Sequence, residues 1–323
     1  MSPATVVIRS VKGRSVGEVV EEILDRCDWK AVVPSGGRVV LKPNLSTPYR
    51  DMARCSNTDP DILEAMCRIL LRRTPHVLVA ESDGMRYKAD EAFEIMGYPA
   101  LAERVGFRLV NLSLDEWREV DHPLLRGWPL PRTLLEADCL ISLPVLKTHA
   151  TTVFTGALKN QWGCLPQHNR LLLHRYLDRL IVDVNAILKP RLAVMDALIG
   201  MEGRGPINGR PVRMDYLLAS RDPVALDAAA MRFVGLEPLA ARHLVLAAEA
   251  GLGEIASERI VLDGPVVRWE RDFEPAKRDL PIRLLDLISR SKFLTNHLIF
   301  DGRFFYPLRR VAVTLRRIGL FQG

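Results

Sequence analysis

The stretch CLISLPVLKTHATTVFTGALKNQWG, residues 139–163, constrains both the fold and the chemistry of this chain more than any other. It begins as an apolar run that is typical of a buried strand and reaches Leu146. Lys147 and His149 follow at once, and Lys159 comes later in the same stretch. These polar residues indicate one of two structures. The strand either continues into a loop on the protein surface, or ends at a polar site.

Strand-like runs alternate with helix-like runs along the whole chain. Strands are predicted at residues 4–10, 38–42, 76–82, 108–112, 139–146, 191–198 and 216–220, and helices at 15–27, 57–73, 89–106 (in two pieces), 170–188, 222–235 and 240–250. This alternation predicts an α/β fold, a mainly parallel sheet with flanking helices in one or two lobes. We expect an α/β domain over residues 1–265 and a basic helical extension over 266–323.

Composition excludes several classes of protein. Hydrophobic residues make up 48% of the 323 positions and charged residues 26%, as in ordinary globular proteins. The sequence contains no run of about 18 apolar residues, so it predicts no membrane-spanning helix. The first residues also lack an apolar signal core, so we expect a cytoplasmic protein. The five cysteines are scattered without a CxxC pair, which predicts neither an iron–sulfur cluster nor a zinc site.

The net charge of +6 is concentrated at the C-terminus, because residues 283–323 hold eight Lys or Arg against two acids. The body is therefore not expected to bind nucleic acid, and any attraction to a polyanion or a membrane belongs to this tail. Apolar residues fall at helical spacing between its arginines, at Leu308, Val311, Leu315 and Ile318. Such a helix either packs on its own domain or docks peripherally on a membrane or a protein.

Polar side chains follow several of the predicted strands. They are Lys42 and Asn44, Glu81 and Asp83, Asn111, Lys147 and His149, and Asp196. The carboxyl ends of parallel strands meet at the ligand crevice of an open sheet, so these residues are expected to converge at one edge.

The residue types at this edge suit two kinds of chemistry. A histidine and a desolvated lysine can exchange protons near neutral pH, which predicts acid–base roles for Lys147, His149 and Lys159. Carboxylates such as Glu81 and Asp83 could hold a divalent metal, because hard cations prefer oxygen ligands. The plainer interpretation of the ESDG and KPNL segments is that each forms a turn.

The glycine-rich loop MEGRGPINGRP, residues 201–211, matches neither a dinucleotide fingerprint nor a P-loop. Its backbone amides around Gly203 and Gly205, with Arg204 beside them, could still cradle an anion. An ordinary hairpin or lid loop is the alternative.

The ordered motifs LKPNL, TDPDILEA, ESDG, LISLPVLKTHATTVFTGALKNQWG, VMDALIGMEGRGPINGRP, LASRDPVALDAAA and EAGLG resemble the domain of unknown function 362 family between about residues 38 and 253. The resemblance marks Lys42, Asn44, Glu81, Asp83, Lys147, His149, Lys159, Asn160, Asp196 and the 203–206 loop. Apart from Lys159, Asn160 and the loop, these are strand-end positions chosen above. The family sometimes occurs in iron–sulfur proteins with a ferredoxin-like module, which this sequence lacks.

Together these features predict an enzyme that binds a small anionic molecule bearing a carboxylate or a phosphate. The predicted roles are catalytic for His149, Lys147 and Lys159, substrate-binding for Lys42, Asn44, Asn160, Gly203, Arg204 and Gly205, and metal-binding for Glu81, Asp83 and Asp196. The alternatives are a non-catalytic redox or assembly partner of an iron–sulfur protein, and a docking scaffold that acts through the basic tail.

Overall fold

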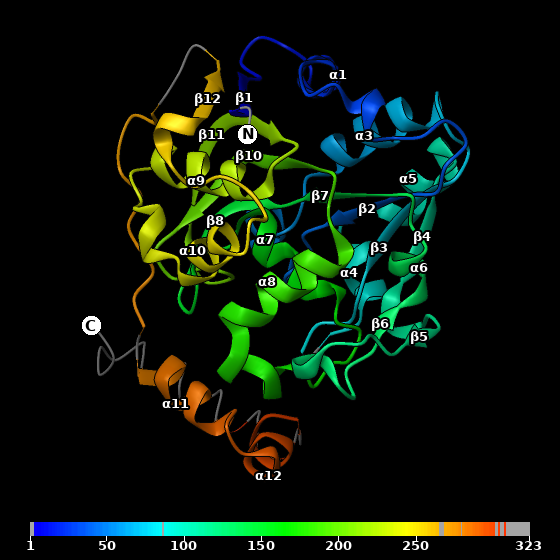
Figure 1. Ribbon diagram of the computed structural model, residues 1–323. Helices are drawn as coiled ribbons and strands as arrows, with labels where there is room; N and C mark the ends of the chain where they lie inside the picture. The colour runs from blue at the N-terminus through cyan, green and yellow to red at the C-terminus, as the bar shows by residue number, and fades with distance from the viewer. Residues whose placement is uncertain are drawn as a thin grey trace.

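A ten-stranded sheet forms the centre of the computed structural model, which describes residues 3–85, 87–264, 268–278, 280–300, 303 and 307 (Figure 1). Its strand order is β12-β1-β11-β10-β7-β2-β3-β4, with β8 on β10 and β9 on β8. The strands are β1 (Ala4–Ser10), β2 (Val39–Pro43), β3 (Val77–Glu81), β4 (Arg108–Asn111), β7 (Cys139–Leu143), β8 (Val145–His149), β9 (Val153–Phe154), β10 (Leu192–Glu202), β11 (Arg210–Ser220) and β12 (Ile260–Asp263). A separate two-stranded sheet pairs β5 (Trp117–Arg118) with β6 (Leu130–Pro131).

The sheet is mixed but mostly parallel, which confirms the predicted fold class. Neighbouring strands are parallel in one half of the sheet, which consists of β10, β7, β2, β3 and β4 in that order. Strand β1 is also parallel to β12. Strand β11 is antiparallel to both β1 and β10, because β10 and β11 form a long hairpin. The glycine-rich loop 203–209 is the connection of that hairpin.

The helices are α1 (Val16–Arg26), α2 (Arg50–Ser56), α3 (Pro60–Leu71), α4 (Ala89–Ile95), α5 (Tyr98–Val105), α6 (Arg132–Leu135), α7 (Gly156–Asn160), α8 (Leu177–Leu188), α9 (Pro223–Phe233), α10 (Arg242–Glu249), α11 (Leu280–Ile288) and α12 (Lys292–Leu294). A capping box between Ser15 and Glu18 begins α1. The predicted helix 170–188 is α-helical only from Leu177, because Arg170–Tyr176 forms a 3-10 helix.

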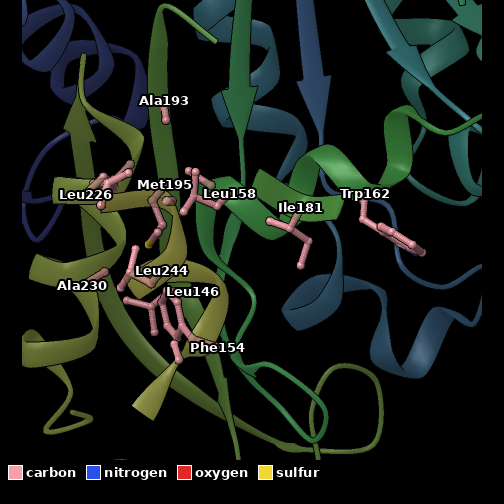
Figure 2. Close-up of a cluster of buried hydrophobic side chains, with 14 of the residues drawn as sticks. Leu146, Phe154, Leu158, Trp162, Ile181, Ala193, Met195, Leu226, Ala230 and Leu244 are labelled. Atoms are coloured by element: carbon pink, nitrogen blue, oxygen red, sulfur yellow. The ribbon is translucent and has the colours of Figure 1, made fainter. Parts of the chain in front are cut away.

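Alternating side chains of each central strand pack into two separate cores. Val39 and Leu41 of β2 face one core, which includes residues of α1 and α3, whereas Val40 faces the other. That second core includes residues of α8, α9 and α10, so helices cover both faces of the sheet. Figure 2 shows part of it, with Leu146 of β8, Leu158 of α7 and Met195 of β10 close together. This three-layer packing holds the strand ends that carry the candidate site.

Two sequence predictions concern the termini and the membrane. No helix in the described part of the chain is long and apolar enough to cross a membrane. The apolar positions predicted for a tail helix, Leu308, Val311, Leu315 and Ile318, lie outside the described residues.

All five cysteines are buried. Burial raises the pKa of the Cys164 thiol to about 12, so this thiol is inert at neutral pH.

Candidate functional site

A buried ion pair joins the ends of β2 and β3. Lys42 donates from Nζ to Oε2 of Glu81 at 2.6 Å and to the carbonyl of Pro43 at 2.8 Å, and both charged side chains are almost completely buried. The other oxygen of Glu81 accepts the backbone N–H of Ser82 at 2.9 Å. Burial raises the pKa of Glu81, and the ammonium of Lys42 opposes that shift. The positive charge of Lys42 and the negative charge of Glu81 therefore neutralise each other at the edge of the sheet.

Lys147 follows the apolar run of β7 and β8, and every hydrogen of its ammonium has an acceptor. Nζ donates to Oδ1 of Asn44 at 2.7 Å, to Oγ of Ser46 at 2.6 Å and to the carbonyl of Ser56 at 2.8 Å. This is the geometry of the charged form, although burial and the charge of Lys159 lower its pKa to about 7. Lys147 thus ties β8 to the loop after β2 and to the end of α2, and has no hydrogen left for a ligand.

Two asparagines connect the strand ends to the short helix α7. Asn44 donates from Nδ2 to Oδ1 of Asn160 at 3.0 Å. Asn160 in turn donates to the carbonyl of Lys42 at 2.9 Å and to Oγ of Ser142 at 3.0 Å. These bonds fix the last turn of α7 above the ends of β2 and β7, and therefore fix the position of its neighbour Lys159.

The other end of α7 is held by a buried carboxylate. Asp227 of α9 accepts the backbone N–H groups of Ala157 at 2.6 Å and Leu158 at 3.0 Å, and burial raises its pKa to about 7. Gly156 adopts a φ of 55°, and a Cβ there would lie 2.3 Å from Oδ1 of Asp227. Only glycine allows this approach, so the carboxylate can cap the helix.

Lys159 differs from the other two lysines of the site because its ammonium is not engaged. The side chain is partly exposed, and no hydrogen bond or ion pair joins it to a described residue. Burial, together with the charges of Arg170 and Lys42, lowers the pKa of Lys159 to about 7. A large fraction of this lysine is therefore a free amine at neutral pH.

His149 is held as a neutral imidazole. Its Nδ1 accepts the backbone N–H groups of Thr151 at 3.0 Å and Thr152 at 3.3 Å, and burial with the charge of Lys159 lowers its pKa well below 6.5. The remaining nitrogen, Nε2, therefore carries the hydrogen and can only donate. The geometry favours a hydrogen-bond donor in place of the acid–base role predicted from the sequence.

Arg170 belongs to the site but was not singled out in the sequence. Its Nη1 donates to the carbonyls of Asp83 at 2.9 Å and Leu165 at 2.8 Å and to Oγ of Ser82 at 3.1 Å. It lies in a segment with the pattern of an ordinary helix, so no local signal marked it. A sequence signal did exist for Ser142, which interrupts the apolar run of β7.

The three acids predicted to bind metal do not form one ligand set. Asp83 accepts the N–H of Ala89 at 2.9 Å and the amide of Asn111 at 3.0 Å, whereas Asp196 accepts the N–H groups of Asp59 at 2.9 Å and Leu198 at 3.0 Å. Within the described ranges, no group of three or more His, Cys, Asp or Glu side chains could hold a metal ion. Glu81, Asp83 and Asp196 instead order the loops around the lysines.

The glycine-rich loop packs on the end of β8 through its carbonyls. Thr148 donates from Oγ1 to the carbonyl of Gly203 at 3.1 Å, and a Cβ on Gly205 would lie 1.9 Å from the carbonyl oxygen of Thr148. The N–H of Gly203 already donates to the carbonyl of Glu274, and that of Gly205 to the carbonyl of Gly203. Arg204 is exposed. The amides are thus occupied, and the predicted anion cradle is not open in this conformation.

Residues 39–232, more than half of the chain, match the family described as Domain of unknown function (DUF362). The chain belongs to the DUF362 family. The matched span extends from β2 into α9 and contains the lysine cluster, which is formed by Lys42, Lys147 and Lys159.

A curated relative of this DUF362 chain is a thylakoid-associated protein of Synechocystis sp., which is 28% identical over 241 residues, 70% of this chain and 72% of the relative. Among solved structures, the lactate racemase apoprotein of Thermoanaerobacterium thermosaccharolyticum aligns with a TM-score of 0.47 and 12% identity. That alignment covers 72% of this chain and 57% of the racemase chain.

A groove of about 1180 Å³ lies at the opposite edge of the sheet, where β1 and β10 begin. Its walls include Arg26, Asn185, Arg191 and Asp222, and none of the predicted site residues lines it. The lysine cluster of this DUF362 chain is therefore separate from this groove.

Proposed function

We propose that the chain is an enzyme that binds a small carboxylate- or phosphate-bearing molecule at the carboxyl edge of the sheet and uses Lys159 as its acid–base group. The observation that carries the proposal is the unengaged, partly exposed amine of Lys159, with a pKa near 7. A proton-transfer group is most effective when its pKa lies near the operating pH.

The local charge supports an anionic ligand. Lys42, Lys147 and Arg170 are three cations around Lys159, and Glu81 is the carboxylate that pairs with one of them, Lys42. An anion beside Lys159 would offset this excess and raise the pKa of the amine, because a nearby negative charge favours the ammonium form.

Each group then has a distinct role. Lys159 takes a proton from the substrate as an amine and returns it as an ammonium. The Nε2–H of His149 donates to a substrate oxygen, and Arg170 adds attraction for the anionic group. Lys42, Lys147, Asn44 and Asn160 are positioning residues, because their polar atoms are bonded to one another and to the surrounding loops.

The proposal is tested by titrating small carboxylates and inorganic phosphate into the protein at pH 6.5 and recording the melting temperature. A ligand at 100 times its Kd adds about 2.7 kcal/mol of stability. We expect such a shift in the wild type and in Lys12→Met, which removes an exposed lysine, but not in Lys159→Met. Equal shifts in all three proteins would place anion binding elsewhere and contradict the proposal.

A membrane-peripheral location is a second proposal. The relative from Synechocystis is described as thylakoid-associated. By analogy, this chain would work on a small anionic molecule beside a membrane while remaining outside the bilayer. Fractionation of cells that produce the chain tests this, with recovery in the membrane pellet at low salt and release at high salt as the expected result.

A further inference from the structure

Exposed apolar side chains gather on the segment that contains α11 and α12. Among the described residues, ten large hydrophobic side chains are exposed, and four of them lie between positions 284 and 294. They are Leu284 (48% exposed), Leu287 (60%), Phe293 (67%) and Leu294 (40%). Figure 1 shows α11 and α12 outside the layered body. A local apolar patch of this kind is typical of an interaction surface.

A basic recess lies within the same segment. It has a volume of about 550 Å³ and is lined by Arg278, Arg283, Asp286, Leu287 and Arg290. Asp286 forms an ion pair with Arg278, whereas neither Arg283 nor Arg290 forms an ion pair with a described residue. Arg283 of α11 and Arg290 of the turn that follows it both line this recess together with Leu287.

The turn between α11 and α12 is internally fixed. Ser289 donates from Oγ to the carbonyl of Asp286 at 2.8 Å, and Thr295 donates from Oγ1 to the carbonyl of Ile288 at 2.9 Å. Both hydroxyl side chains are buried. The apolar and basic side chains are therefore presented together by one ordered turn.

We propose that this docking face, formed by Arg283, Leu284, Leu287, Arg290, Phe293 and Leu294, binds a membrane surface that contains anionic phospholipid. Leucine and phenylalanine side chains enter the boundary between headgroups and acyl chains, while arginines bind lipid phosphates, as in interfacial amphipathic helices. The recess between Arg283 and Arg290 would hold one phosphate.

The positive charge of the docking face indicates which partner binds it. The remaining segment of the chain, residues 301–323, carries five arginines and one aspartate, so its sign is the same as that of the docking face. It would repel the arginines if it covered them. An anionic bilayer has the complementary sign and attracts both segments together.

The test is sedimentation of the full chain with vesicles of 30% phosphatidylglycerol in phosphatidylcholine, compared with pure phosphatidylcholine. We expect binding to the anionic vesicles in 50 mM salt and its loss in 500 mM salt. Arg283→Gln/Arg290→Gln should weaken binding about thirtyfold, because each basic residue near such a surface contributes about 1 kcal/mol.

The apolar part is tested by Leu287→Asn/Leu294→Asn, which should also weaken binding at least tenfold. The matched control is Leu114→Asn/Leu239→Asn, which removes two exposed leucines of the body and should bind as the wild type does. Unchanged melting temperatures verify that all variants are folded. The inference is overturned if the two leucine pairs behave alike, if neutral vesicles bind equally well, or if the docking face instead mediates concentration-dependent self-association without vesicle binding.

Discussion

The side-chain amide of Asn44 donates a hydrogen bond to the side-chain oxygen of Asn160 at 3.0 Å, across 116 positions of sequence. Asn44 also accepts a hydrogen bond from Lys147, and Asn160 also donates one to the carbonyl of Lys42. The ammonium groups of Lys42 and Lys147 are therefore held by hydrogen bonds, whereas the ammonium of Lys159, next to Asn160, bonds to no described residue. The following predictions test this difference and the contacts around it.

Replacing Asn160 by Ala should lower the free energy of unfolding by about 2–4 kcal/mol, because the amide of Asn44 and the carbonyl of Lys42 lose buried partners. Urea unfolding measures this change. Asn208→Ala, at an exposed position of the hairpin loop, is the control and should stay within about 0.5 kcal/mol of the wild type. Equal stability of the two variants would contradict a structural role for the asparagine pair.

The ion pair of Lys42 and Glu81 should show strong coupling. Lys42→Met leaves a buried carboxylate without its cation and should cost roughly 3–5 kcal/mol, whereas Lys42→Met/Glu81→Leu should recover part of that loss. A double-mutant cycle by chemical unfolding gives the coupling. If the losses from the two single substitutions simply add, the pair does not act as a unit.

Gly163 should not tolerate even one added carbon. A Cβ at this position would lie 2.6 Å from Oε1 of Glu81 and 2.8 Å from Nζ of Lys42, so Gly163→Ala should disturb the ion pair and cost about 1–3 kcal/mol. Gly17→Ala in α1, where a Cβ meets nothing within 4 Å, should be neutral or slightly stabilising. Thermal unfolding of the two variants decides between these expectations, and a neutral Gly163→Ala would refute the close packing.

Glu202 predicts a specific dependence of stability on pH. Hydrogen bonds from Arg271 and Arg210 lower the pKa of this carboxyl from 4.5 to about 2, so its contribution is complete above pH 4.5 and is lost as the pH falls through 2. With allowance for the half-exposed Arg271, that contribution is about 2 kcal/mol. Glu202→Gln should therefore be less stable than the wild type at pH 6, and the difference should shrink towards pH 2. A difference independent of pH would contradict the assignment.

Local patterns in the sequence were sufficient to predict a mainly parallel sheet with flanking helices. The predicted strand 139–146 is divided into β7 and β8, and β8 continues through Lys147 to His149, so these two residues lie within a strand and not after one. The antiparallel pairing of β10 and β11 was not predicted, because the same apolar pattern suits either direction.

The roles of individual site residues could not be predicted, because they depend on contacts between distant segments. Lys147 and Lys159 have the same side chain, and the three oxygens that segment 44–56 offers to Lys147 distinguish them. The state of His149 depends on two backbone amides of the following turn, which spacing alone does not reveal. Arg170 is positioned by carbonyls from two loops, for which no sequence motif exists.

The pH dependence of amine acylation at Lys159 tests the central claim most directly. The protein is treated with a limiting amount of acetic anhydride between pH 5.5 and 10, and the labelled lysines are quantified by peptide mass spectrometry, with exposed Lys12 as the internal reference. The account predicts a rate at Lys159 that is half-maximal near pH 7, whereas ordinary lysines approach this point only near pH 10. A profile at Lys159 that parallels that of Lys12, or no labelling of Lys159 at any pH, would contradict the account.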